Sequence, residues 1–161
     1  MRTMTVSRTV VLPDGKKNVF EHLKKMETLQ NVSKPYASFE RIMEQEEAVR
    51  PDHNEWQEAA DYAFSLTVFH CLPVGIHRIH ILHFDADEIS TLEGNEKVPI
   101  WNHRIILQPV TDESCIYTDE LEIGAGMPTA LVCLWAKLYL RHRQRKWVKL
   151  LRKSKKTDSF G

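Results

Sequence analysis

The sequence contains few cysteines and no apolar run long enough to cross a membrane. Its three cysteines, Cys71, Cys115 and Cys133, form no C-x-x-C pair, and their odd number does not suit a disulfide framework. The apolar run from Met127 to Leu140 is interrupted by Lys137, and the first fifteen residues lack the apolar segment of a signal peptide. We therefore expect a cytoplasmic protein whose cysteines are small buried hydrophobic side chains.

The sequence also lacks the short motifs of common catalytic and cofactor-binding sites. It contains no G-x-S-x-G, H-E-x-x-H, P-loop or G-x-G-x-x-G pattern. Three of its eight histidines, His77, His80 and His83, lie close together in the sequence. On a strand, however, His77 and His83 would point to one face and His80 to the other. The sequence therefore predicts no metal site, no cofactor and no catalytic signature.

Neither sign of charge is in excess, but the charges are unevenly distributed. The 22 basic and 22 acidic residues balance, whereas residues 40–61 carry eight acids and residues 137–156 carry ten bases. The balance argues against a dedicated nucleic-acid binder, so no specific nucleic-acid partner is expected. We interpret the basic run as a solvated helix face, with contact to an anionic membrane surface or a nucleic acid as the alternative. In the membrane alternative, the apolar side chains between the bases would enter the lipid: Trp147, Val148, Leu150 and Leu151.

The strongest positive signal is a long helix over residues 127–153. Gly124, Gly126 and Pro128 mark its start, because glycine tolerates the turn and proline loses nothing in a first helical turn. At ~1.5 Å per residue the helix would be ~40 Å long, so its apolar side needs a broad cover. The expected apolar face repeats at three- and four-residue steps: Leu131, Leu134, Trp135, Leu138 and His142.

The rest of the chain reads mainly as strands joined by short turns. A first strand over Met4 to Leu12 is followed by a helical pattern over Lys16 to Met26 that continues weakly to Val32. Short links between the later strands imply an antiparallel meander. The six later strands are expected at residues 36–44, 60–72, 76–84, 88–93, 98–108 and 115–123.

This order predicts an α+β fold in one domain over residues 1–153, with a disordered basic tail at 154–161. A twisted antiparallel sheet of this size curls, and its concave face needs a cover that only the long helix can supply. We therefore expect a seven-stranded curved antiparallel sheet wrapped around the C-terminal helix, with one or two short helices between the first two strands.

Three segments make the sequence resemble the START, polyketide-cyclase and birch-pollen-allergen superfamily. They are TVSRTVVLPDGKKNVFEHL at residues 5–23, PIWNHRIILQP at 99–109, and IYTDELEI at 116–123 followed by GAG and the amphipathic helix. The resemblance implies the helix-grip fold and a hydrophobic cavity between sheet and helix that holds a lipid, sterol, polyketide or similar molecule. Residues 44–58, which contain several acids and Trp56, match no part of this pattern.

Alternation assigns inward faces on three strands. On the strand over residues 98–108 the inward side chains are Trp101, His103, Ile105 and Leu107, and on the next strand Asp119 lies among apolar inward neighbours. Antiparallel pairing places His103 directly opposite Asp119 or one inward position away. The full set of expected ligand-binding residues is Tyr62, Phe64, Leu66, Trp101, His103, Ile105, Tyr117, Asp119, Leu121, Leu131, Trp135 and Leu138.

A buried Asp119 requires a partner, and His103, Tyr117 and the Trp101 indole are the candidates. Such a polar patch in an apolar concave surface is typical of a small-molecule site, but it also fits an internal network that fixes two strands. We expect the loops at residues 72–75, 94–99 and 124–128 to form the mouth of the cavity.

Three functions remain open from the sequence. The first is a carrier that binds one hydrophobic small molecule under the long helix. The second is a polyketide cyclase or dehydratase in which His103 acts as general acid or base and Asp119 orients it. The third is a protein-interaction module that uses the outer surface of the same fold.

Overall fold

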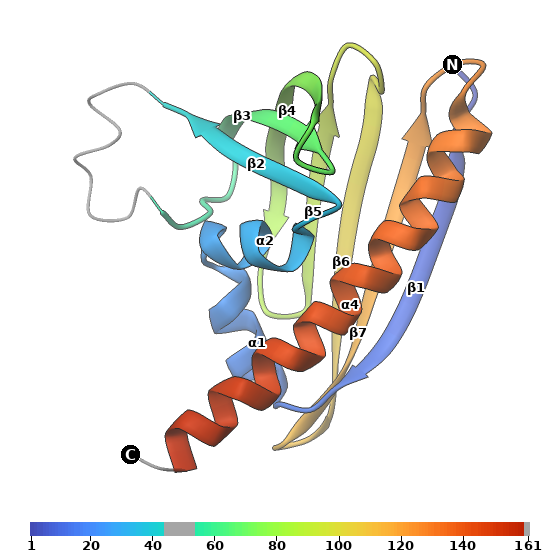
Figure 1. Ribbon diagram of the computed structural model, residues 1–161. Helices are drawn as coiled ribbons and strands as arrows, with labels where there is room; N and C mark the ends of the chain where they lie inside the picture. Colours follow the sequence, from blue (N-terminus) through green and yellow to red (C-terminus); the bar gives the residue numbers. More distant parts are fainter. Residues whose placement is uncertain (44–53, 160–161) are drawn as a thin grey trace.

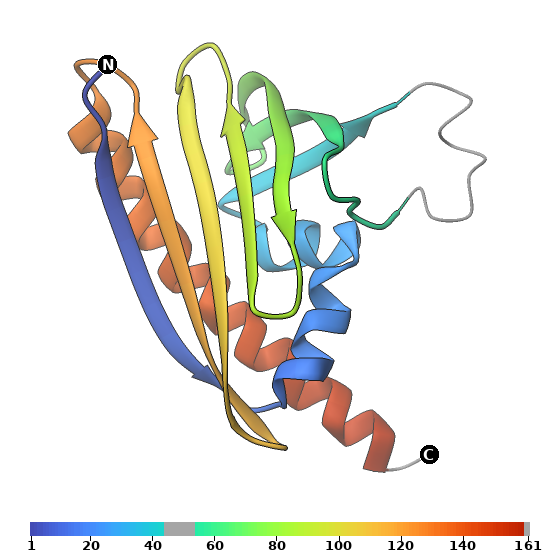
Figure 2. The same cartoon turned by 180° about the vertical axis from the view of Figure 1, so that it is seen from behind.

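The structure describes residues 1–43 and 54–159, and within these residues the chain forms one seven-stranded antiparallel sheet and three helices. In this computed structural model the strand order is β1-β7-β6-β5-β4-β3-β2, so β1 and β2 are the two edges. Figures 1 and 2 show the sheet from its two sides, with the long helix α4 crossing one face. The predicted α+β helix-grip architecture is confirmed. The strands are β1 Met4–Leu12, β2 Ala37–Ile42, β3 Asp61–Val68, β4 Leu72–Phe84, β5 Glu88–Gly94, β6 Ile100–Thr111 and β7 Ser114–Gly124.

Two short helices connect β1 to β2, as the sequence predicts. Helix α1 spans Lys16–Leu23 and helix α2 spans Met26–Ser33. The apolar positions Val19 and Leu23 of α1 are buried against the rest of the interior. Figure 1 places both helices on the same side of the sheet as α4, where they close one end of the concave face.

The C-terminal helix α4 spans Thr129–Ser159, which is longer than predicted. The turn that leads into the helix is held by Thr129, whose Oγ1 accepts the backbone N–H of Ala125 at 2.9 Å and donates to the carbonyl of Gly126 at 2.7 Å. At its other end the helix continues past Lys153, so residues 154–159 of the expected disordered tail are helical in the structure. In this extension the hydroxyls of Thr157 and Ser159 donate to the backbone carbonyls of Lys153 and Lys155, one turn earlier in the helix.

The prediction of which face of α4 is buried is wrong. The buried positions lie about one residue further along the helix than the predicted apolar positions. Leu131, Leu134 and Leu138 are 70%, 57% and 47% exposed, although their spacing predicted an apolar face covered by the sheet. The buried stripe repeats at steps of three and four residues along a neighbouring face of the helix. Its members are Cys133, Ala136, Leu140, Arg143, Trp147 and Leu151.

The turn between β3 and β4 also differs from the prediction. The sequence indicated a turn at Pro73–Gly75, but these residues lie inside β4, where Gly75 adopts φ of 116° next to a break in the β3–β4 register. The chain reverses at residues 69–71, and both Phe69 and His70 adopt positive φ there. Phe69 and His70 are not residue types that mark a turn in a sequence, although both adopt positive φ here. The sequence pattern therefore indicated a turn at the nearby proline and glycine instead.

The cysteine and histidine predictions are partly corrected. Cys115 and Cys133 are buried, but Cys71 is exposed. A β-bulge between Ile81 and His83 leaves His83 exposed beside Asp85, whereas His77 is buried. Across residues 1–43 and 54–159, no three His, Cys, Asp or Glu side chains come together as metal ligands. In the same residues no helix has both the length and the apolar character needed to cross a bilayer.

The interior between sheet and helices has two ends with different packing. The filled end, around Leu12, Tyr117, Trp147 and Leu151, is formed by β1, β7, α1 and the C-terminal half of α4, and these four side chains are completely buried. The hollow end lies around the N-terminal half of α4 and the strand ends near Trp101 and Leu66, which are only partly buried. The names "filled end" and "hollow end" are used below in this sense.

Candidate ligand cavity and polar belt

The hollow end contains a cavity of about 550 Å³. This volume lies within the range of ~300–1,000 Å³ that small-molecule sites in proteins occupy. One wall is formed by α4 and the other by β2, β3, β4, β6 and the loop after β5. The lining side chains are Ala37, Phe39, Leu66, Val68, Phe69, Val74, His77, Asn95, Lys97, Val98, Trp101, Leu131, Val132, Leu134, Trp135, Leu138 and Tyr139.

Aromatic rings form much of the helix side of this large cavity. Trp135 and Tyr139, one turn apart on α4, stack with their ring centroids 5.1 Å apart and their planes at 8°. Trp101 on β6 meets Trp135 at a centroid distance of 5.8 Å, which joins the sheet wall to the helix wall. Rigid aromatic walls of this kind can bind a flat or chain-like apolar molecule at little cost in side-chain entropy.

A row of polar side chains crosses the concave face between the hollow end and the filled end. We call this row the polar belt. It consists of His77 on β4, Glu93 on β5, His103 on β6, Asp119 on β7 and Arg143 on α4. Each of these four neighbouring strands contributes one inward-facing residue, and each residue is one inward position out of register with the next, so the row runs diagonally across the sheet. The helix contributes the last residue.

The first half of the polar belt is the pair formed by His77 and Glu93. Asn95 Oδ1 accepts the backbone N–H groups of Lys97 and Val98, so its amide nitrogen is the donor that lies 3.2 Å from His77 Nδ1. His77 therefore holds its proton on Nε2 and donates it to Glu93 Oε2 at 2.9 Å. Thr91 donates to the other carboxylate oxygen at 2.5 Å.

The second half of the polar belt centres on Asp119, which is completely buried. His103 Nε2 lies 2.8 Å from Asp119 Oδ1, and the Tyr117 hydroxyl donates to the same oxygen at 3.0 Å. Gln144 donates to Oδ2 at 3.1 Å, and Arg143 Nε lies 3.4 Å from Oδ1 as a buried ion pair. The β6–β7 register pairs Asp119 with Ile105 and His103 with Leu121, so the histidine and the acid are one inward position apart, as one of the two predicted alignments required.

Both carboxylates of the polar belt are held in the ionised form. Burial raises the pKa of Asp119, but the charge of Arg143 and the hydrogen bonds of His103 and Gln144 outweigh it, so the pKa lies below its ordinary value. Burial likewise raises the pKa of Glu93, and the hydrogen bonds from His77 and Thr91 help to bring the pKa below its ordinary value. By contrast, burial raises the pKa of the Tyr117 hydroxyl, which stays a neutral donor.

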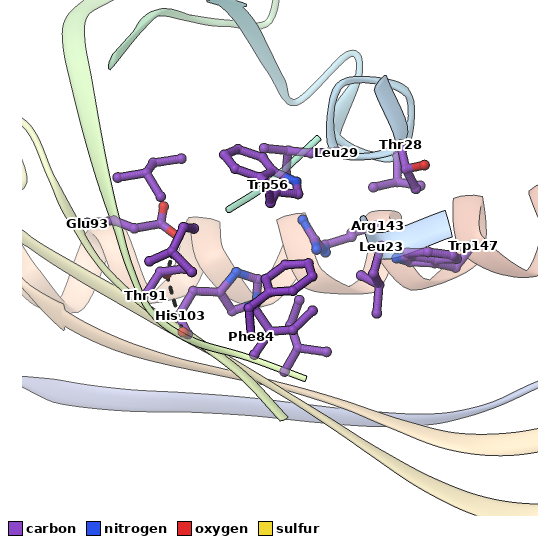
Figure 3. A pocket seen from close by; sticks show the side chains of 15 residues that line it. Leu23, Thr28, Leu29, Trp56, Phe84, Thr91, Glu93, His103, Arg143 and Trp147 are labelled. Carbon is purple, nitrogen blue, oxygen red and sulfur yellow. Dashed lines mark hydrogen bonds between the residues drawn. The ribbon is translucent and has the colours of Figure 1, made fainter. Parts of the chain in front are cut away.

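A second and much smaller cavity of about 60 Å³ lies on the filled side of the polar belt. Figure 3 shows the Arg143 guanidinium reaching from α4 into this small cavity, with the His103 ring on the sheet side and Trp56 opposite. Its lining residues are mostly apolar: Leu23, Leu29, Val32, Trp56, Ile79, Ile81, Phe84, Ile89, Ile105 and Trp147, with the polar side chains Thr28, Thr91, Glu93, His103 and Arg143.

The predicted site residues fall into four places. Leu66, Trp101, Leu131, Trp135 and Leu138 line the large cavity. His103 and Ile105 line the small cavity, and Asp119 stands behind His103 in the polar belt. The other predicted residues pack in the interior and line neither cavity: Tyr62, Phe64, Tyr117 and Leu121.

Sequence reasoning missed His77, Glu93 and Arg143. Arg143 lies in a basic run that was interpreted as a solvated face, yet it falls at helical steps between Leu140 and Trp147, and this spacing was the available signal. Glu93 shares strand parity with the inward residues Ile89 and Thr91, which was the corresponding signal on β5. Of the three loops expected at the mouth, the one after β5 lines the large cavity, and Val74 does so from within β4.

Comparison with known proteins gives matches in structure but not in sequence. No protein-family model matches the sequence, and no curated protein matches it either. A START superfamily protein from Mycobacterium smegmatis superposes with a TM-score of 0.69 at 13% identity, covering 92% of this chain and 97% of that chain. Norcoclaurine synthase from Thalictrum flavum, solved with dopamine and hydroxybenzaldehyde, gives a TM-score of 0.64 at 11% identity, covering 94% and 88%. The chain therefore has the helix-grip fold that START superfamily proteins and norcoclaurine synthase share.

Proposed function

We propose that this protein binds and carries one hydrophobic small molecule in the large cavity. The observation that supports this most is the cavity of about 550 Å³ itself, in a domain of this size, with walls made largely of aliphatic and aromatic side chains. Protein interiors are normally close-packed, so a hollow of this volume beside a fully packed end indicates space kept for a guest. In the norcoclaurine synthase structure the same fold holds small aromatic molecules.

Native mass spectrometry of protein purified from its own cells, followed by solvent extraction, tests this proposal. The expected result is a mass above that of the polypeptide, accounted for by an extractable apolar compound. Added back at about 100 times its dissociation constant, that compound should raise the free energy of unfolding by ~2.7 kcal/mol. A bare polypeptide mass, together with no stabilisation by any apolar compound of suitable size, would contradict the proposal.

An enzymatic function is the second candidate, and the orientation of His103 favours it. Its Nε2 is bound to Asp119, and no hydrogen bond found among the described residues engages its Nδ1, while the ring lines the small cavity. A carboxylate-oriented imidazole with a free nitrogen can act as a general base or acid. In an enzyme His103→Gln should lower the rate by roughly two to four decades. In a carrier the same variant should keep most of its affinity for the guest.

Contact with an anionic membrane surface is a finer part of the carrier proposal. Trp147 and Leu151, which were expected to enter the lipid, are fully buried and cannot do so. The exposed side of α4 instead carries Leu131, Leu134 and Leu138, followed at the same helical spacing by bases. A groove beside β1 continues this basic surface, and its charged lining consists of Arg8, Arg141, Arg145, Lys146, Lys149 and Arg152.

Vesicle flotation tests the membrane contact. We expect the protein to float with phosphatidylserine-containing vesicles more than with pure phosphatidylcholine vesicles, and Leu134→Glu to reduce this binding. Leu92→Glu is the matched control, because Leu92 is similarly exposed but lies on β5, away from α4. Equal flotation with both vesicle types would contradict the membrane contact without affecting the cavity proposal.

The third candidate, a protein-interaction module, is not favoured. A filled interior without a pocket would have supported it, whereas the hollow end contains the large cavity. A cytoplasmic location remains part of the carrier proposal, and Cys71, Cys115 and Cys133 are all free thiols in the structure.

A further inference from the structure

The small cavity is bordered by buried N–H donors that lack a partner. Trp147 is completely buried, and its indole Nε1 has no hydrogen-bond partner among the described residues. Arg143 is nearly completely buried, and in the same residues its Nε has no hydrogen bond, although the Asp119 carboxylate lies 3.4 Å away. Unpaired buried donors destabilise a folded protein, so their retention calls for an explanation.

The two carboxylates of the polar belt are already engaged by other donors. Both oxygens of Glu93 accept hydrogen bonds, from His77 and Thr91. Both oxygens of Asp119 also accept, from His103 and Tyr117 on one side and from Gln144 on the other. Because these carboxylates make no hydrogen bond to the Trp147 indole or to Arg143 Nε, a ligand that completes these two donors must supply an acceptor.

The charges of the polar belt decide which kind of acceptor fits. Glu93 and Asp119 contribute two carboxylates, and Arg143 contributes one guanidinium. An anionic group would thus enter a site without net positive charge and would lose its hydration, whereas a neutral carbonyl oxygen accepts hydrogen bonds without this cost.

The small cavity lies next to the large one across the polar belt. His77 lines the large cavity and hydrogen-bonds Glu93, which lines the small cavity. On the helix, Tyr139 lines the large cavity one turn before Arg143, which lines the small one. A single chain-like molecule could therefore place its body in one cavity and its end in the other once the side chains between them rotate.

We propose that the small cavity binds a neutral carbonyl oxygen at the end of an otherwise apolar guest, with the Trp147 indole N–H and the Arg143 guanidinium as its donors. This inference rests on the proposed carrier function and specifies the class of its guest: long apolar ketones or other uncharged carbonyl compounds. Fatty acid anions and plain hydrocarbons are excluded from this class. The about 60 Å³ of the small cavity is enough for a carbonyl group and its methyl neighbour.

Three probes of equal chain length test the inference: 2-undecanone, 2-methyl-1-undecene, in which a methylene group replaces the ketone oxygen, and undecanoate. Dissociation constants are measured for each by displacement of a fluorescent apolar probe. The ketone should bind about tenfold more tightly than the alkene, as one hydrogen bond to a buried donor predicts. It should also bind more tightly than the carboxylate at neutral pH. The infrared carbonyl stretch of bound 2-undecanone should lie below its value in hexane.

Two tryptophan variants provide a matched pair. Trp147→Phe removes an unpartnered indole N–H at the small cavity, and Trp135→Phe removes an unpartnered indole N–H at the large cavity. The preference for the ketone and the infrared shift should decrease in Trp147→Phe and persist in Trp135→Phe. Should Trp147→Phe fail to fold, the comparison of the three probes on the unaltered protein still decides the inference.

The outcomes separate this inference from the carrier proposal. Equal affinity for ketone and alkene with an unshifted carbonyl stretch overturns the inference and leaves the carrier function standing. Tightest binding of undecanoate overturns the neutral-acceptor assignment in the same way, and so does a ketone preference that disappears in Trp135→Phe alone. Failure of all three probes to bind overturns both the inference and the carrier function for guests of this class.

Discussion

The two ends of the interior are built by the same sheet and the same helix, yet one is packed and the other is hollow. Around Trp147 and Leu151 the C-terminal half of α4 is covered by β1, β7 and α1, and these side chains have no exposed surface. Around Leu134 and Leu138 the N-terminal half of α4 stands away from the strands and leaves about 550 Å³. The difference teaches that a close-packed region and the region proposed to bind a guest occupy separate parts of one interior, with the polar belt between them.

The polar belt should show the largest effect on stability. Asp119→Ala removes the carboxylate that compensates Arg143, and the remaining buried charge should lower the free energy of unfolding by about 3–5 kcal/mol. Glu122→Ala is the control, because Glu122 lies on the outer face of β7, and its effect should stay within about 0.5 kcal/mol. Urea unfolding of both variants gives the comparison. Similar small losses in the two variants would show that the belt contributes little to stability.

Two leucines on the same helix compare the filled end with the hollow end directly. Leu151→Ala opens a void in close-packed surroundings and should cost about 2–5 kcal/mol. Leu138→Ala changes a side chain that is 47% exposed at the large cavity, so the expected loss is below about 1 kcal/mol. Equal losses in thermal or urea unfolding would mean that the hollow end is packed in solution.

The acid dependence of stability should come from the polar belt and not from the apolar ends. The pKa values of Asp119 and Glu93 are lower in the folded protein than in the unfolded chain, where carboxyl groups titrate near about 4. Their contribution is therefore fully present above about pH 4 and is lost as the pH falls through the folded pKa values. Unfolding measured from pH 7 down to pH 2 should show this decline, and Glu93→Gln should make it shallower. An unchanged pH profile in Glu93→Gln would contradict the assignment.

Much of the sheet could be predicted from the sequence because strand alternation has a period of two residues and leaves little ambiguity. On β6 and β7 the inward positions of Trp101, His103 and Asp119 follow from this alternation, and the meeting of His103 with Asp119 follows from antiparallel pairing. The long helix as cover for the concave face followed from the order of the elements, and the resemblance to the helix-grip superfamily added the expectation of a cavity between them.

The rotation of α4 could not be predicted because hydrophobicity marks where apolar side chains occur and not whether they meet a core or a cavity. Leu131, Leu134 and Leu138 form the clearest apolar stripe in the sequence, yet they line the rim of the large cavity. Arg143 and Gln144 are buried inside a basic run, because Asp119 and the backbone carbonyl of Arg8 supply partners that are distant in sequence. Such long-range pairing leaves no local pattern.

Binding of the neutral fluorescent probe 1-aminoanthracene to a cavity-filled variant tests the central claim most directly. Val98 lines the large cavity, so Val98→Trp should fill part of it, whereas Ile76→Trp adds the same side chain at an exposed position of β4 outside the lining. We predict that Val98→Trp weakens binding of the probe at least about tenfold while the Ile76→Trp variant binds like the unaltered protein, with both variants folded by circular dichroism. Unchanged binding in the Val98→Trp variant would show that the apolar guest does not occupy the hollow end.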